Sequence, residues 1–160
     1  MKIRCFILLD VILVYVSADP RNETECRRGW IPHGTSCYLI SHERQDWHSS
    51  EAMCELLGGY LVEIQNADED AFIRRIVDSL QKSVWTGGAD IEQEGKWVWM
   101  ASMEPVNYAN WDSGEPNSYQ NSDENCVDVR PGHSGWNDER CMTIQNYVCE
   151  NSEREVAVIG

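Results

Sequence analysis

Two stretches of the chain have the apolar spacing of amphipathic helices. From Trp47 to Leu57, apolar residues recur three and four positions apart, with Asp46 before them as an N-cap and Gly58-Gly59 after them as a stop. Further on, Asn66 and Glu69 have the spacing of a capping box. The apolar stripe that follows predicts a second helix ending near position 80, and it consists of Phe72, Ile73, Ile76, Val77 and Leu80.

Short runs with strand character make up most of the remaining pattern. Residues 26–40, CRRGWIPHGTSCYLI, have a Pro/Gly turn between two cysteines and predict a stapled hairpin. A short apolar strand is predicted at 60–64, between the helices. Four more runs follow position 80, namely VWTGG from Val84, KWVWM from Lys96, CVDVR from Cys126 and YVCE from Tyr147. The pattern predicts an α+β fold with two helices, an antiparallel sheet and irregular loops on one side.

Two of the predicted loops, 87–95 and 101–125, are long and rich in Gly, Asn, Asp and Pro. Loops of this length inside a compact domain are usually functional or disordered. Tryptophans punctuate this half of the chain, which predicts ordered loops held against a core; they are Trp97, Trp99, Trp111 and Trp136. We assign Trp97, Trp99 and Trp136 to packing.

The first 18 residues have the pattern of a secretory signal peptide cut after Ala18. Lys2 and Arg4 precede an apolar run from Cys5 to Val16, followed by small residues. This run is too short to span a bilayer comfortably, and no later stretch is apolar enough to do so. We therefore expect a secreted, extracellular protein without membrane insertion.

The cysteine count supports an oxidising compartment. The chain has seven cysteines, and cleavage of the signal peptide removes Cys5 and leaves six: Cys26, Cys37, Cys54, Cys126, Cys141 and Cys149. An even number in a secreted protein predicts a disulfide framework. The absence of any C-x-x-C pair disfavours zinc. Spacing alone leaves about fifteen possible pairings.

The charge of the chain narrows the classes of partner. The formal net charge is −14, and loss of Lys2, Arg4 and Asp10 with the signal peptide makes it −15. Such a surface repels nucleic acid and anionic membranes and favours cations. Asn22-Glu23-Thr24 is an N-glycosylation sequon, so Asn22 is a candidate glycosylation site.

Oxygen-bearing side chains gather in GEPNSYQNSDENC, residues 114–126. Glu115 and Asn117 flank a proline and point to the same side of an extended chain. Glu124 lies just before one cysteine, and Asn137 and Asp138 lie just before another. Calcium takes about 6–8 oxygen ligands and tolerates irregular geometry. Spacing leaves two alternatives open, a calcium site or two surface turns rich in Asx residues.

The sequence resembles a C-type lectin domain of the long form, with six cysteines. The resemblance covers residues 26–150, with 19–25 as a lead-in and 151–160 as a C-terminal tail. The matching motifs are Trp30, Cys37-Tyr38, Trp47, Ala52–Cys54, Trp85–Gly88, Glu115-Pro116-Asn117, Cys126, Trp136-Asn137-Asp138, Cys141 and Cys149. It implies the C-type lectin-like fold with a long calcium-binding loop region and three disulfides, Cys26–Cys37, Cys54–Cys149 and Cys126–Cys141.

The resemblance also implies a site in which Ca²⁺ itself binds the sugar. The implied ligands of both are Glu115, Asn117, Glu124, Asn137 and Asp138. The order E-P-N implies mannose, N-acetylglucosamine or fucose, whereas Q-P-D implies galactose. Glu124 lies nine residues after Glu115, where many members have eight, so Asp123 is a competing candidate.

Two further features of the loops carry alternatives. A second calcium site of some family members corresponds to Asp90, Glu94, Ser118 and Asn125. Ser118 and Asn125 stand where aspartates are frequent, and the loss of two charges lowers the affinity for a cation. The other interpretation of these residues is an ordinary acidic loop. Tyr119 is either a ring that stacks on a sugar face or an exposed loop tyrosine.

These observations predict a binding module and not an enzyme. The leading hypothesis is a secreted, calcium-dependent lectin for mannose-type sugars, with a role in innate recognition of microbial glycans. The alternative is a lectin-like structural protein that associates with mineral, ice or a protein partner. A calcium-dependent phospholipase would need adjacent cysteines, and CC never occurs. His133-Ser134 lacks a catalytic motif. One site binds weakly, so an oligomer would supply avidity.

Overall fold

The computed structural model describes residues 26–119 and 123–152. The predicted signal peptide, the lead-in at 19–25 with Asn22, and residues 153–160 of the predicted tail lie outside the described residues. Within the described ranges, no helix has the length and apolar character needed to cross a membrane.

The predicted hairpin forms at the N-terminal side of the fold. Strands β1 (Ile31–His33) and β2 (Ser36–Ile40) pair antiparallel, and the Cys26–Cys37 disulfide staples them. β2 continues the sheet onto β9 (Asn146–Asn151), which also pairs with β3 (Tyr60–Leu61). The strand predicted at 60–64 is therefore wrong beyond Leu61, although the following residues are buried.

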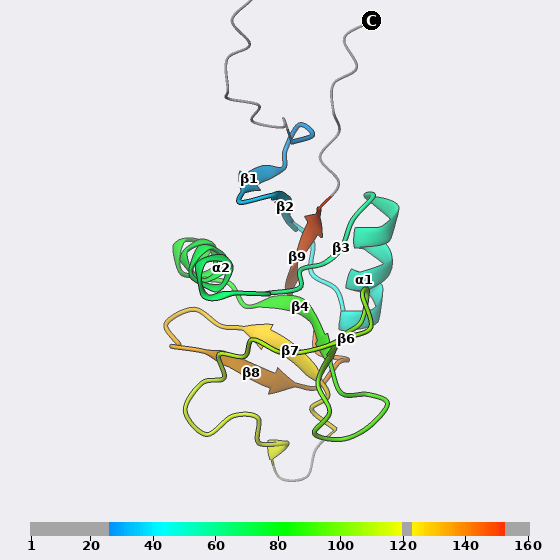
Figure 1. Ribbon diagram of the computed structural model, residues 1–160, viewed down its shortest axis with the longest axis vertical. Coiled ribbons are helices and arrows are strands. Elements are labelled where there is room, and N and C mark those ends of the chain that lie inside the picture. Colours follow the sequence, from blue (N-terminus) through cyan, green and yellow to red (C-terminus); the bar gives the residue numbers. More distant parts are fainter. Residues whose placement is uncertain (1–25, 120–122, 153–160) are drawn as a thin grey trace, which may run out of the picture.

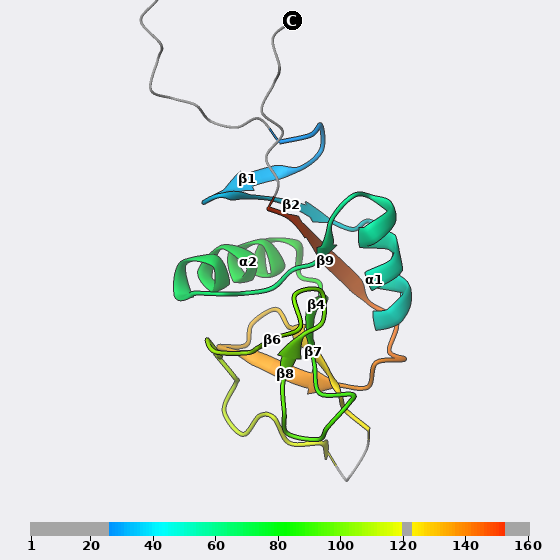
Figure 2. The ribbon, with the colours of Figure 1, turned by 45° about the vertical axis from the view of Figure 1, so that its right-hand side comes forward.

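Both predicted helices are confirmed, with their caps. Helix α1 (Trp47–Leu56) begins after Asp46, whose side chain accepts from the backbone N–H of Ser49. Helix α2 (Ala67–Leu80) begins after Asn66, whose side chain accepts from two backbone N–H groups of the first turn. The capping box differs in one detail: Glu69 accepts from Gln65 N, one residue earlier than expected, and from the Tyr38 hydroxyl. The two helices lie on opposite sides of β9 (Figures 1 and 2).

The second half of the chain builds around β4 (Val84–Ala89), which is buried along its whole length. β4 pairs antiparallel with β5 (Val98–Trp99) and β7 (Cys126–Val129) but parallel with β9. The expectation of purely antiparallel pairing is thus wrong for β4 and β9, and the sheet is mixed. β6 (Glu104–Pro105), which pairs with β5, lies in a segment predicted as a loop, and β8 (Trp136–Glu139), which pairs with β7, lies where no strand was predicted.

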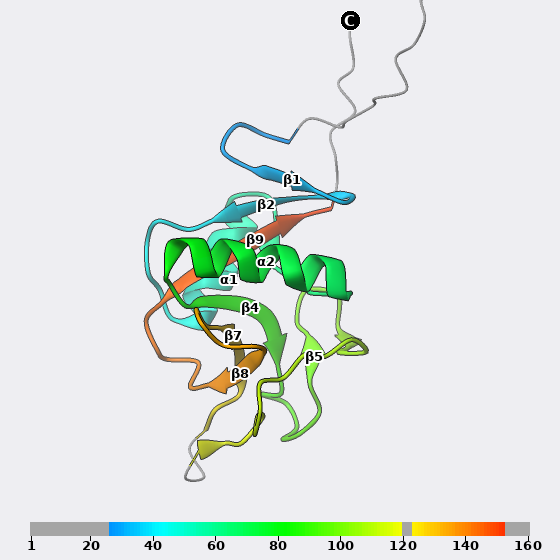
Figure 3. The same ribbon diagram turned by 90° about the vertical axis from the view of Figure 1, so that its left-hand side faces the viewer.

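Three disulfides close the framework in the pairing that the resemblance implied. Besides the hairpin staple, Cys54–Cys149 joins α1 to β9 across 95 residues of sequence, and Cys126–Cys141 joins the start of β7 to the segment after β8. The long loops project from the end of the molecule opposite to β1 (Figures 1 and 3). Because β7 begins where the loop 101–125 ends, residues of β7 and of its partner β8 lie at the base of these loops.

Buried tryptophans hold this loop end to the core, as predicted. Trp99 and Trp136 are fully buried and pack edge to face, and Trp97 packs in the same way on Trp111. Trp136 also donates from Nε1 to a carboxylate oxygen of Asp70 on α2 at 2.7 Å. The polar end of a buried ring is thus satisfied, and the loop end is tied to a helix.

Candidate functional site

The long loop that precedes β7 is fixed at its base against β8. Trp136 N donates to Asn110 O at 2.7 Å, and Asp112 N donates to Trp136 O at 2.8 Å. Gly135 permits this close approach, because a Cβ there would overlap the backbone of residues 110–112. The loop therefore leaves the core from a defined position.

A carboxylate fixes the next turn of the loop. Asp112 accepts from Ser134 Oγ and pairs with Nδ1 of His133, each at 2.7 Å. These bonds, the one from Ser134 first, hold the pKa of Asp112 well below its ordinary value. The carbonyl of Asp112 accepts from Glu115 N at 3.1 Å. Ser134 and His133 both bind this carboxylate, and this arrangement orders the loop. For Ser134 to act as a nucleophile, His133 would have to be hydrogen-bonded to its hydroxyl instead.

Three of the predicted ligands meet at a buried carboxylate on β8. Asp138 is only 1% exposed, yet both of its oxygens accept from Asn117 N at 3.0 Å, and one accepts from Ser118 N at 2.7 Å. The amide of Asn117 donates to the Glu115 carboxylate, and the peptide bond between Glu115 and Pro116 is cis. We refer to Glu115, Asn117 and Asp138 as the Asp138 cluster.

The charge of the Asp138 cluster is not balanced by the protein. Burial of Glu115 and its contact with Asp138 raise the pKa of Glu115 to about 7, and Glu124 adds to the effect. The positive charge of Arg130, which directly follows β7, lowers the pKa of Glu115 in the opposite sense. Burial accounts for the largest part of this shift, and the rest comes from neighbouring carboxylates whose negative charge a bound cation would neutralise. The residues present therefore fit a hard divalent cation.

Glu124, which the resemblance assigned as a ligand, also lies beside the Asp138 cluster. Its carboxylate accepts from Tyr119 N at 2.6 Å and acts electrostatically on Glu115. Asp123 instead lines a hollow with His48 and Arg140, and no contact joins it to the Asp138 cluster among the described residues. The geometry therefore favours Glu124 over Asp123 as the fourth member. The ring of Tyr119 is 63% exposed at this edge, where a ligand can reach it.

Asn137 lies on β8 directly before Asp138, and successive side chains of a strand point to opposite faces. It is 8% exposed, and its amide donates to the main-chain carbonyl of Asp138. Its neighbour across the ladder is Asp128 of β7. All five predicted ligands therefore come from β8 or from the loop that leads to β7.

The residues predicted for a second cation site lie next to the first. Asp90 is 2% exposed; one oxygen accepts from Gly95 N at 2.7 Å, and the other is buried without a hydrogen-bond partner among the described residues. Burial of Asp90, together with the charges of Glu94 and Asp138, raises its pKa. Ser118 Oγ donates to Glu94 at 3.1 Å. The main-chain carbonyl of Asn125 accepts from Asp90 N at 3.1 Å, which brings Asn125 next to Asp90.

Carboxylates alone do not form the candidate site. Within 26–119 and 123–152, no three His, Cys, Asp or Glu side chains converge as a metal cage. The Asp138 cluster combines two carboxylates with an amide, and a second amide, that of Asn137, directly precedes Asp138 on β8. Calcium accepts such amide and carbonyl oxygens together with carboxylates. The donor set therefore suits calcium better than a metal that requires nitrogen or sulfur ligands.

Sequence reasoning missed the charged network beneath these residues. Arg130 pairs with Asp128 at 3.1 Å and with Glu139 at 2.8 Å. Burial raises the pKa of Asp128 to about 6. The alternation of CVDVR carried the signal, because Asp128 on β7 and Arg130, one residue past its end, point to the same side of an extended chain. Their partner on β8 could not be inferred, because no strand was predicted at residues 136–139.

Comparisons with known proteins agree with this architecture. The sequence pattern of the Lectin C-type domain matches residues 43–151. A perlucin-like protein of Mytilus galloprovincialis is 34% identical over 152 residues, covering 89% of this chain and 95% of that protein. The galactose-specific lectin nattectin of Thalassophryne nattereri is 31% identical over 132 residues, 81% of this chain and 82% of the relative.

Solved structures show the same fold. The carbohydrate-recognition domain of the mouse scavenger receptor C-type lectin superposes with a TM-score of 0.75 at 32% identity, over 82% of this chain and 99% of that domain. A calcium-independent type II antifreeze protein superposes with a TM-score of 0.70 at 28% identity, over 79% and 94%. This is a fold of non-enzymatic carbohydrate-binding domains, and the chain belongs to the C-type lectin domain family.

Proposed function

We propose that this protein is a secreted, calcium-dependent lectin for mannose-type sugars. The observation that carries the proposal is the Asp138 cluster, in which an E-P-N segment and a W-N-D strand meet with unbalanced negative charge. The proposed ligands of both calcium and sugar are Glu115, Asn117, Glu124, Asn137 and Asp138. Calcium would supply the positive centre on which two neighbouring sugar hydroxyls replace water.

The side chains around that centre set which sugar fits. Ionised carboxylates of Glu115 and Glu124 only accept hydrogen bonds, and the amides of Asn117 and Asn137 can donate them. The alternation of acceptor and donor therefore matches one arrangement of neighbouring hydroxyls better than another. The order E-P-N supports mannose, N-acetylglucosamine or fucose. Tyr119 lies where its ring can pack on the sugar face.

A glycan array with and without calcium tests this function. We expect signal on glycans with terminal mannose, N-acetylglucosamine or fucose in calcium, and none in chelator. Binding to galactose-terminated glycans alone, as the name of the nattectin relative would suggest, contradicts the proposed specificity while leaving the calcium site intact. Innate recognition would be supported if the glycans bound are microbial.

A second candidate is a lectin-like protein that binds a mineral, an ice surface or a protein partner. The structural likeness to a calcium-independent antifreeze protein and the net charge of −14 favour keeping it. Release from immobilised mannan by chelator separates the two functions. A surface-binding protein would not be retained on mannan in calcium at all.

A further inference from the structure

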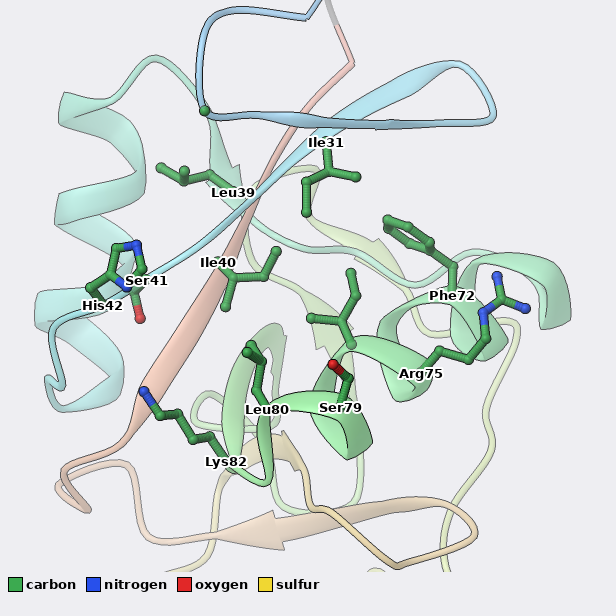
Figure 4. Close-up of a pocket in the computed structure, with 12 residues that line it drawn as sticks. Ile31, Leu39, Ile40, Ser41, His42, Phe72, Arg75, Ser79, Leu80 and Lys82 are labelled. Atoms are coloured by element: carbon green, nitrogen blue, oxygen red, sulfur yellow. The ribbon is translucent and has the colours of Figure 1, made fainter.

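An apolar groove lies between the β1–β2 hairpin and helix α2, away from the Asp138 cluster (Figure 4). Its volume is about 630 Å³, within the usual range of small-molecule sites. The apolar lining comes from both walls: Ile31, Leu39 and Ile40 from the hairpin, and Phe72, Ile76 and Leu80 from α2. Ile31 and Leu80 are 41% and 44% exposed, so this surface is left in contact with water.

Basic side chains stand at both ends of the groove, and more of them gather at one end. His42 and Lys82 stand at that end, and Arg75 stands at the other (Figure 4). His42 and Lys82 also line an adjoining polar hollow of about 390 Å³, to which Arg44 contributes a third basic side chain. Among the ion pairs of residues 26–119 and 123–152, Lys82, Arg75 and Arg44 have no acidic partner.

This basic end is unusual in so acidic a chain. The sequence has 27 Asp and Glu residues against 13 Lys and Arg, yet no described residue that lines the groove or the adjoining hollow is acidic. A surface cleft lined by one sign of charge concentrates ligands of the opposite sign. An apolar channel that opens into a basic hollow therefore matches a ligand with an alkyl chain and one anionic head.

We propose that the groove binds a free long-chain fatty acid, with the alkyl chain between the hairpin and α2 and the carboxylate among His42, Arg44 and Lys82. Removing methylene groups from water favours the chain in the groove, and charge-assisted hydrogen bonds favour the carboxylate at its end. A lipid within a membrane is a poorer match, because a protein of net charge −14 is repelled by anionic bilayers. This binding needs neither calcium nor sugar.

The test is calorimetric titration of the full chain with octanoate, decanoate and dodecanoate below their micellar concentrations. Chelator is present throughout, which prevents calcium soaps and keeps the readout separate from the lectin site. Affinity should rise by roughly two- to fourfold for each added methylene. Dodecylammonium, which has a chain of the same length with the opposite charge, should bind at least tenfold more weakly than dodecanoate.

Two comparisons, each of a variant with its control, test where the fatty acid binds. Arg44→Gln with Lys82→Gln should weaken dodecanoate binding about tenfold, whereas Lys96→Gln, a lysine outside both hollows, should leave it unchanged. Leu80→Ser should weaken it, and Leu56→Ser on the exposed side of α1 should not. Equal binding of dodecylammonium, no dependence on chain length, or equal losses in a variant and its control would overturn the proposal.

Other occupants of the groove would also overturn it, and each has its own signature. If dodecanoate binds only a variant that ends at Ser152, residues 153–160 fill the groove in the full chain. If dodecanoate fails to bind and Leu80→Ser abolishes a concentration-dependent dimer, the groove is occupied by a second copy. Analytical sedimentation of the parent, of the variant that ends at Ser152 and of Leu80→Ser distinguishes these results.

Discussion

At the scale of single residues, Asp138 has two tasks in the candidate site. It accepts backbone hydrogen bonds from Asn117 and Ser118, which orders the loop, and its contact adds to the effect of burial in raising the pKa of Glu115. The charge of Arg130, which directly follows β7, partly offsets this repulsion. Substitution of Asp138 would thus disturb loop structure and cation binding together, so Glu115 and Asn117, which are less buried, are better probes of the ligand preference.

Exchanging the acid and the amide at these two positions should change the preferred sugar. We expect Glu115→Gln with Asn117→Asp to weaken mannose binding at least tenfold and to favour galactose, because donors and acceptors around the hydroxyls are interchanged. Retention on immobilised mannose and galactose measures the change. Glu104→Gln, exposed on β6, is the matched control. An unaltered mannose preference would mean that sugar binds elsewhere.

Among the elements, β8 connects the core to the loops, and Gly135 sets its distance from them. Gly135→Ala should destabilise the protein by about 1–3 kcal/mol, because the added Cβ displaces the backbone of residues 110–112. Mannose binding should fall as well, since Glu115 follows that segment. Chemical denaturation and mannose retention are measured on the same preparation. Ser113→Ala, exposed in the same loop, should match the parent; if Gly135→Ala does so too, the loop base does not set the site.

The sheet of β2, β9 and β3 contains a carboxylate that makes stability depend on pH. Burial first, then repulsion from Glu69 and Glu63, raises the pKa of Glu150 from 4.5 to about 7. The folded state therefore binds this proton more tightly than the unfolded chain. Its stabilising effect is fully present below about pH 4.5 and is lost as pH rises through 7.

Glu150→Gln should remove this dependence. At pH 8 the variant should be more stable than the parent by on the order of 1–3 kcal/mol, and at pH 5 the difference should be much smaller. Urea denaturation at both pH values measures it. Asp128, whose pKa is also raised, is present in both proteins, so the difference isolates Glu150. A constant difference across pH would show that Glu150 ionises normally in the fold.

The same elements show what the sequence could and could not predict. Helix α1 and helix α2 followed from local signals, a cap and an apolar stripe, which do not depend on distant residues. β8 was missed because W-N-D-E has polar residues in place of strand formers, and its pairing with β7 overrides that weak propensity. The parallel pairing of β4 with β9 joins residues some 60 positions apart, which no local pattern encodes.

The candidate site was predictable for a different reason. Its residues sit in short motifs, E-P-N and W-N-D, so the resemblance located them without any knowledge of the sheet. The structure brings Glu115, Asn117 and Asp138 into contact. What supports them was not predictable, because the pairing of Arg130 with Glu139 depends on the register of β7 and β8.

For the whole molecule, the proposed calcium site predicts that calcium stabilises the fold. We expect calcium at about a hundred times its Kd to stabilise the fold by about 2.7 kcal/mol, because only the native chain brings the ligands together. Thermal melting in calcium, in chelator and in magnesium measures this effect. Magnesium is the matched control, since it requires near-octahedral geometry and releases water reluctantly. The same midpoint in calcium and in chelator would contradict the assignment of the site.

The most direct test of the account measures mannose binding by equilibrium dialysis at a series of calcium concentrations. We predict that bound mannose rises with calcium to about one per chain and disappears in chelator. Mannose binding that is equally strong in chelator, or calcium binding without any gain in mannose binding, would contradict the claim that both share the Asp138 cluster.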